Sequence, residues 1–201
     1  MAHTQLRRRA LVMYERPPDP GWRLRGIMLA ANILLIFILL ALPWIYYYTL
    51  PEIVPTHWGL QGEVTSTGSK YDAVLILSVT MPIANIIILI IWTFRWVLVR
   101  KYPYLITLPA ITMVLGSEKF PQEKKDEIIE KIFDISLLIG IIVGVYMLIL
   151  EWGILESMRT GTNPVWLTIF SIVGIVFLII PPFLLYRKIY REEILPYTQP
   201  Q

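Results

Sequence analysis

Four long hydrophobic stretches, each without a charged residue in its middle, constrain the fold of this chain more than any other feature. Hydrophobic residues make up 56% of the 201 residues, and most charged residues gather between these stretches. An α-helix of about 20 apolar residues spans the ~30 Å hydrocarbon core of a bilayer, and the runs lack the period-two alternation of a β-barrel. The sequence therefore predicts an all-α, polytopic membrane protein with a four-helix transmembrane bundle. The predicted spans cover residues 26–48, 73–94, 135–155 and 165–186.

Lysine and arginine are distributed very unevenly about these spans. Sixteen of the 18 lie before the first span, between the second and third, or after the fourth, whereas Lys70 and Arg159 lie in the other two loops. Because basic residues are retained on the cytoplasmic side, we expect a multi-pass protein of the cell membrane with both termini cytoplasmic. The predicted segments are a basic cytoplasmic arm (1–25), a membrane domain (26–190) with an outer loop (50–71) and a cytoplasmic loop (95–134), and a cytoplasmic tail (191–201).

The cytoplasmic loop has two parts of different character. Residues 102–115 are apolar but too short to span a bilayer, so we expect an interfacial or re-entrant segment. A helix is predicted to begin at Pro121, because the first helical position has no need of the N–H that proline lacks. Glu127 and Lys131 have the spacing and order of a stabilising i,i+4 pair. No breaker follows, so one long helix is predicted from Pro121 to Glu156.

The outer loop is rich in residues that fix the backbone. Pro51 and Pro55 stiffen its start, and Gly59, Gly62 and Gly68 permit turns with positive φ. A flexible linker has no need of prolines and glycines at such specific positions, so we expect an ordered cap on the outer surface of the membrane.

The same loop resembles a known family. Its pattern Leu-Pro-x-x-Val-Pro-Thr-His-Trp, followed by Gly-x-x-Gly and by Gly-Ser-Lys, is similar to a membrane domain of unknown function that is widespread in bacteria and archaea. That domain forms the N-terminal part of the immunity proteins that protect sporulating bacteria from the sporulation-delaying toxin. The resemblance covers residues 26–95, departs from the family at Leu60 and Gln61, and implies binding of an extracellular toxin with a relay to a cytoplasmic repressor. The residues that carry it are Pro51, Val54, Pro55, His57, Trp58, Gly59, Gly62 and Lys70.

His57 carries the most distinctive chemistry in this loop. One hypothesis is a metal ligand, with Glu63, Glu52 or Asp72 completing a site of nitrogen and oxygen donors. A second is a group that changes charge near neutral pH or contacts a ligand. The third is structural, with the imidazole stacked on Trp58 and bonded to the turn backbone. No cofactor is predicted, and the candidate ligand-binding residues are His57, Trp58, Glu52, Glu63 and Lys70.

Small and polar residues inside the spans predict close helix packing. Ser136, Gly140 and Gly144 recur every four residues along one stripe of the third span, where small residues let another helix approach. We expect packing within the bundle, with homodimerisation as the alternative. Asn32 and Asn85 are expected to hydrogen-bond between helices.

Two other residues, one inside the second span and one near the outer end of the third, interrupt the apolar pattern. Pro82 is expected to kink the second span. Glu151 is expected to escape the hydrocarbon by lying at the interface and to pair with Lys70 or Arg159, since a carboxylate inside the bilayer is costly.

These features favour a non-enzymatic protein that binds or senses an extracytoplasmic peptide or protein ligand through residues 50–70. The alternative is an accessory or structural subunit that packs against another membrane protein or a second copy of itself. A small transporter or a membrane enzyme is the third reading, although no catalytic spacing or inverted repeat supports it. The lipid bilayer is the expected environment, and no folded basic surface predicts nucleic-acid binding.

Overall fold

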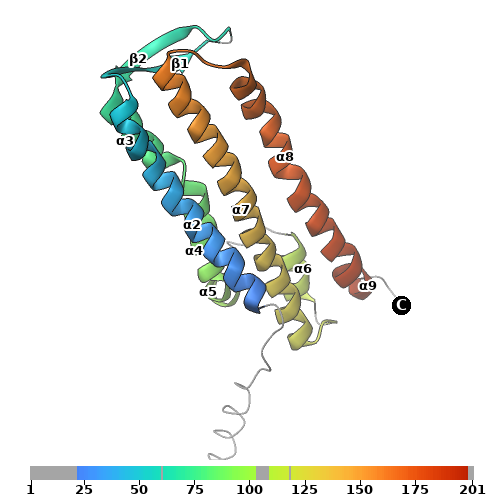
Figure 1. The fold of residues 1–201 in the computed structure, drawn as a ribbon. Coiled ribbons are helices and arrows are strands. Elements are labelled where there is room, and N and C mark those ends of the chain that lie inside the picture. Colours follow the sequence, from blue (N-terminus) through green and yellow to red (C-terminus); the bar gives the residue numbers. More distant parts are fainter. Residues whose placement is uncertain (1–21, 60, 103–108, 118, 199–201) are drawn as a thin grey trace, which may run out of the picture.

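The computed structural model describes residues 22–59, 61–102, 109–117 and 119–198. Its helices form an elongated bundle with a two-stranded antiparallel hairpin across one end (Figure 1). Four helical segments are long and apolar enough to cross a membrane, which confirms the predicted fold class. In chain order the elements are α2 (Trp22–Tyr46), η1 (Tyr47–Thr49), β1 (Ile53–Trp58), β2 (Val64–Ser69), α3 (Lys70–Thr80), α4 (Ile83–Thr93), α5 (Arg95–Lys101), α6 (Pro109–Gly116), α7 (Gln122–Thr160), α8 (Val165–Ile189), the π-helical turn η3 (Tyr190–Ile194) and α9 (Leu195–Thr198).

The two ends of the bundle are named by what they carry. The hairpin face is the end covered by β1 and β2, and the terminal face is the end where α2 begins and α8 finishes (Figure 1). The outer loop is ordered, as predicted, but it takes the form of strands, which the sequence did not predict.

α7 is the central element of the bundle. It runs without interruption for 39 residues, which corresponds to about 58 Å at 1.5 Å per residue. The predicted long helix is therefore confirmed, and it extends four residues further, to Thr160. It begins at Gln122, because Pro121 has an extended backbone conformation just before the first turn, so the prediction of Pro121 at the first helical position is wrong by one residue. Gly161 then ends it with a φ of 75°, the left-handed conformation that glycine adopts at helix ends. Because α2, α4 and α8 all pack against α7, it connects every other long helix.

The second span consists of two helices. α3 ends at Thr80 and α4 begins at Ile83, with Met81 and Pro82 between them. Pro82 has no N–H to donate to the preceding turn, so regular helical hydrogen bonding stops at this point. The structure therefore shows an interruption of the second span at the position where a kink was predicted.

Two fully buried asparagines hold the middle of the bundle together. The Asn85 side-chain amide donates to Asn32 Oδ1 at 3.2 Å and to the carbonyl of Gly140 at 2.8 Å. The Asn32 amide donates to the carbonyl of Leu137 at 2.9 Å. These bonds join α2, α4 and α7, as predicted for the two asparagines, and they form what is called here the asparagine layer.

The glycine stripe of α7 makes room for this layer. A Cβ on Gly140 would lie 2.2 Å from Asn32 Oδ1, and one on Gly144 would lie 2.7 Å from Asn85 Nδ2. Both distances are too short for any side chain. Ser136, one turn earlier, donates its hydroxyl to the carbonyl of Phe133 in its own helix. The stripe therefore faces helices of the same chain.

The terminal face combines an apolar cluster with long-range ion pairs. Arg25 of α2 pairs with Glu130 at 2.9 Å and with Asp134 at 2.6 Å on α7. Glu193 of η3 pairs with Lys124 at 2.5 Å and Lys131 at 2.6 Å, and the predicted Glu127–Lys131 pair is present at 2.8 Å. The terminal cluster consists of Val99, Ile111, Val114, Phe120, Ile128, Ile129, Ile132, Phe133 and Ile194.

The apolar segment 102–115 contributes to this cluster. Residues 103–108 lie outside the described residues, and α6 follows them. Ile111 and Val114 of α6 are fully buried in one cluster with residues from the first turns of α7. This short helix therefore helps to fasten the terminal face.

Candidate functional site

The outer loop folds back on itself as the hairpin β1–β2. The pairing is antiparallel, with Val54 opposite Gly68 and irregular register around His57. Gly62 takes a φ of 85° in the turn, which favours glycine. Gly59 and Gly68 do not take positive φ, so the expected use of positive φ at these two glycines is wrong, although the Gly59 carbonyl accepts the Gly62 N–H that closes the turn. A Cβ on Gly59 would instead collide with the Glu63 carboxyl group, 1.8 Å away.

The inner side of the hairpin packs on the ends of the helices. Val54 is fully buried and Leu50 nearly so, against α3 and the last turns of α7. At the tip, a Cβ on Gly62 would lie 3.2 Å from the carbonyl oxygen of Asn163, in the loop between α7 and α8. The hairpin therefore covers the bundle from α3 to the α7–α8 loop. The hairpin cluster consists of Leu50, Val54, Ala73, Val74, Leu77, Leu155 and Met158.

Lys70 joins the two ends of the hairpin. Its ammonium group lies 2.9 Å from Glu52 Oε1, and its backbone N–H donates to the Glu52 carbonyl at 3.1 Å. The same ammonium lies 4.7 Å from the centre of the Tyr47 ring, a distance at which a cation is attracted to the aromatic face. The structure thus brings the predicted residues Glu52 and Lys70 together where the strands meet α3.

His57, Trp58 and Glu63 lie at the other end of the strands. His57 pairs with Ser66 in the sheet, but its exposed side chain makes no hydrogen bond, ion pair or ring contact within the described ranges. Trp58 is half-buried against the hairpin cluster, and its indole N–H is buried without an acceptor among the described residues. Glu63 accepts the backbone N–H of Gln61 at 3.1 Å. No group of three or more His, Cys, Asp or Glu side chains in the described part of the chain is placed to hold a metal ion.

Glu151 contradicts two expectations. Lys70 pairs with Glu52, and Arg159 pairs with Glu156, so the predicted partners of Glu151 are engaged elsewhere. Its side chain is fully buried instead of exposed at an interface, and neither carboxyl oxygen has a partner among the described residues. The spacing could have revealed this, because Glu151 follows Gly144 by seven residues, which returns a helix to the same face.

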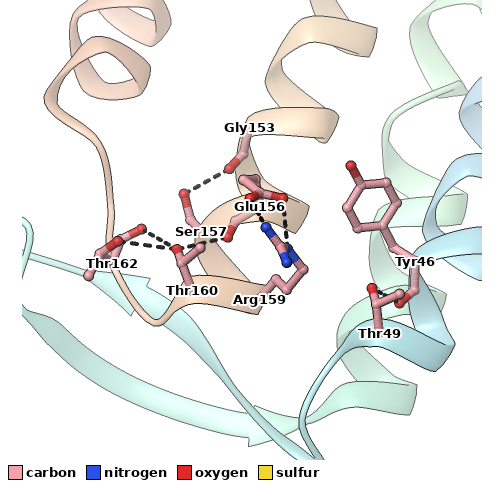
Figure 2. Close-up of polar contacts among 8 residues, drawn as sticks. All are labelled: Tyr46, Thr49, Gly153, Glu156, Ser157, Arg159, Thr160 and Thr162. Atoms are coloured by element: carbon pink, nitrogen blue, oxygen red, sulfur yellow. Dashed lines mark hydrogen bonds and ion pairs between the residues drawn. The ribbon is translucent and has the colours of Figure 1, made fainter.

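The last turns of α7 are held by their own side chains (Figure 2). Ser157 donates its hydroxyl to the Gly153 carbonyl at 2.7 Å, and Thr160 donates to the Glu156 carbonyl at 2.9 Å. The guanidinium of Arg159 binds the Glu156 carboxylate on the side of α7 that faces Tyr46 (Figure 2). The hairpin therefore rests on a well-formed helix end.

The fold and the hairpin define a class: a polytopic helical membrane protein with a small structured cap on one face. Residues 34–81 match a family described as a domain of unknown function (DUF1648). An uncharacterized protein of Archaeoglobus fulgidus is 34% identical over 169 residues, covering 84% of this chain and 88% of the relative. The chain therefore belongs to the same family as this archaeal relative and carries a match to the DUF1648 domain. No solved structure matches it significantly.

Proposed function

We propose that this is a non-enzymatic integral membrane protein of the cell membrane that binds or senses an extracytoplasmic ligand through the hairpin. The orientation follows from the sequence: with sixteen of 18 basic residues on one side, the hairpin face points outward and the terminal face lies in the cytoplasm. The resemblance to immunity proteins supports a ligand of peptide or protein nature, with α7 as the route to a cytoplasmic partner.

The observation that carries the proposal is the attachment of the hairpin to α7. Val54 of β1 and Leu155 of α7 are both fully buried in one cluster. At its other end the same helix bears Glu130 and Asp134, which hold Arg25, and Lys131, which holds Glu193. A ligand that displaces the hairpin therefore acts directly on an element that reaches the opposite face.

The outer surface of the hairpin suits an extended polypeptide. A two-stranded sheet leaves one backbone edge of each strand unpaired, and sequences usually protect such edges with proline or charge. β1 contains Pro55, whereas β2 has neither proline nor a charged residue from Val64 to Ser69, and all but Gly68 are exposed. Addition of a strand to an open edge is a common mode of peptide recognition. Exposed Ile53 and Tyr48, 68% and 88% exposed, add apolar contact area nearby.

The proposal is tested by affinity purification in mild detergent of the parent chain and of a variant with charged residues on β2. Thr65→Lys and Thr67→Lys place charges on the exposed strand and leave the buried Val54 side intact. A partner that co-purifies with the parent chain and is lost from this double variant supports the hairpin as the binding surface. The matched control is Lys101→Thr on the terminal face, where the side chain is also exposed. Equal recovery of the partner with the parent and with the edge variant contradicts the proposal.

A second function, that of an accessory subunit, is favoured by the groove between α7 and α8. The groove has a volume of 480 Å³ and an almost wholly apolar lining. α8 packs on α7 on the side away from α2 (Figure 1), and many of its apolar side chains are exposed. A transmembrane helix of another protein would fill this groove. A gently solubilised sample that runs as a monomer with no co-purifying protein contradicts this alternative.

A further inference from the structure

Glu151 is the most anomalous side chain in the described part of the bundle. It is fully buried, and neither carboxyl oxygen finds a partner within the described residues. Buried polar groups in folded proteins are almost always paired, and an ionised carboxylate without a partner is among the most costly exceptions. The closed bundle therefore favours the neutral, protonated form of this carboxyl group.

The helical period of α7 fixes where Glu151 lies. It follows Gly144 by seven residues and precedes Leu155 by four, so the three share one stripe of the helix. Gly144 faces Asn85 of the asparagine layer, and Leu155 belongs to the hairpin cluster. Gly153 lies on the opposite side and faces α8. Glu151 thus lies between the asparagine layer and the hairpin cluster, about 6 Å along the axis from Leu155.

Other ionisable groups at this end of the molecule have different surroundings. Lys70 and Arg159 are paired with Glu52 and Glu156, and Asp72 is exposed. No ion pair joins any of them to Glu151 in the described segments. The titratable or charged groups on the elements around this end are Tyr46, Tyr47, Tyr48, Glu52, His57, Glu63, Lys70, Tyr71, Asp72, Tyr146, Glu156 and Arg159.

We propose that Glu151 is a proton-binding site coupled to the hairpin, so that loss of its proton loosens the hairpin cluster and proton uptake closes it. When the cluster opens, water reaches the carboxyl group and solvates its charged form. The closed state then binds the proton more tightly than the open state, and rising pH must shift the balance toward the open state. By reciprocity, anything that holds the hairpin open releases the proton. The inference does not depend on the ligand of the proposed function.

The test uses the absence of cysteine from the chain. Ala73→Cys places a thiol in the hairpin cluster, where Ala73 is 6% exposed, and Thr65→Cys places one on the exposed strand β2. The rate of maleimide labelling at position 73 is divided by the rate at position 65. This ratio corrects for the increase in labelling rate that thiol ionisation causes as the pH rises. The ratio is expected to rise with pH between about pH 5 and pH 9, by at most about tenfold per pH unit, since one proton is linked to opening.

Matched variants decide whether Glu151 is responsible. Glu151→Gln and Glu151→Leu remove the titrating group in two different ways, and the ratio must become independent of pH in whichever variant folds. His57→Gln must retain the rise, because His57 is exposed on the hairpin whereas Glu151 is buried inside the bundle. Val99→Cys in the terminal cluster must stay unreactive throughout. A flat ratio in the parent, an unchanged rise without Glu151, loss of the rise in His57→Gln, or equal opening at Val99 overturns the proposal.

Discussion

The two faces of the bundle are fastened by different forces. The hairpin face rests on buried apolar side chains, and its ion pairs, Glu52–Lys70 and Glu156–Arg159, include well-exposed partners. The terminal face adds to its apolar cluster a set of ion pairs that joins α2 and η3 to α7. Apolar packing responds little to salt, whereas exposed and half-buried ion pairs are screened by it. The two faces can therefore be loosened separately.

Leu155→Ala is expected to have the largest effect. It removes a fully buried side chain from the hairpin cluster, and such truncations cost about 2–5 kcal/mol. The hairpin should become sensitive to proteolysis while the terminal face stays closed. The matched variant Ile129→Ala, in the terminal cluster, should give the opposite pattern. Both are measured by limited proteolysis and thermal unfolding in detergent, and identical cleavage patterns would refute the separation of the two faces.

Gly62→Ala comes next in size. The φ of 85° disfavours any residue with a Cβ by about 1–2 kcal/mol, and the added atom would also lie 3.2 Å from the Asn163 carbonyl. Gly161→Ala has a similar φ of 75° but meets nothing within 4 Å, so it measures the backbone cost alone. Thermal unfolding should show a larger loss for Gly62→Ala. If Gly161→Ala is the more harmful, crowding of the new methyl group against the Asn163 carbonyl adds no measurable cost at Gly62.

Glu193→Gln should have a moderate effect confined to the terminal face. It removes the carboxylate that joins Lys124 and Lys131 to η3, and for such partly exposed pairs we expect a loss of about 1 kcal/mol. The loss should disappear in high salt, where the parent pairs are screened as well. Thermal unfolding at low and high ionic strength measures it. A loss that persists unchanged in high salt would show that Glu193 acts through packing.

Glu52→Gln is expected to change least. The Glu52 side chain is 85% exposed, and ion pairs in solvent contribute little, while Lys70 keeps its contact with the Tyr47 ring. We expect a thermal unfolding curve indistinguishable from that of the parent. A clear loss of stability would mean that the hairpin face, like the terminal face, depends on charge.

The sequence predicted the long elements of this fold well and the short ones poorly. The spans and α7 were predictable from runs of hydrophobic residues and from the helix-start signal at Pro121. Both signals depend only on residues that are neighbours in the sequence. β1 and β2 lack the alternation of typical strands: β1 contains Pro55, and β2 consists mainly of threonine, serine and glycine. Val54 of β1 is buried in one cluster with Leu155, about 100 residues away in the chain, and no local sequence pattern predicts packing between such distant residues.

The candidate site was predicted to the same partial degree. Glu52 and Lys70 were both selected from the outer loop, and the structure joins them. Glu151 was misplaced because the cost of a carboxylate inside the bilayer suggested an interface, whereas its spacing from Gly144 places it on the buried face of the helix. Whether His57 and Trp58 bind a ligand remains a prediction.

The interruption at Met81 and Pro82 divides the residues that build the hairpin cluster from the rest of the second span. The DUF1648 match ends at residue 81, where α3 has just finished and Pro82 separates it from α4. The matched segment thus brings five members of the hairpin cluster, and α7 must bring Leu155 and Met158 to cover them. In this chain the matched segment alone therefore leaves the cluster open on one side, and α7 closes it.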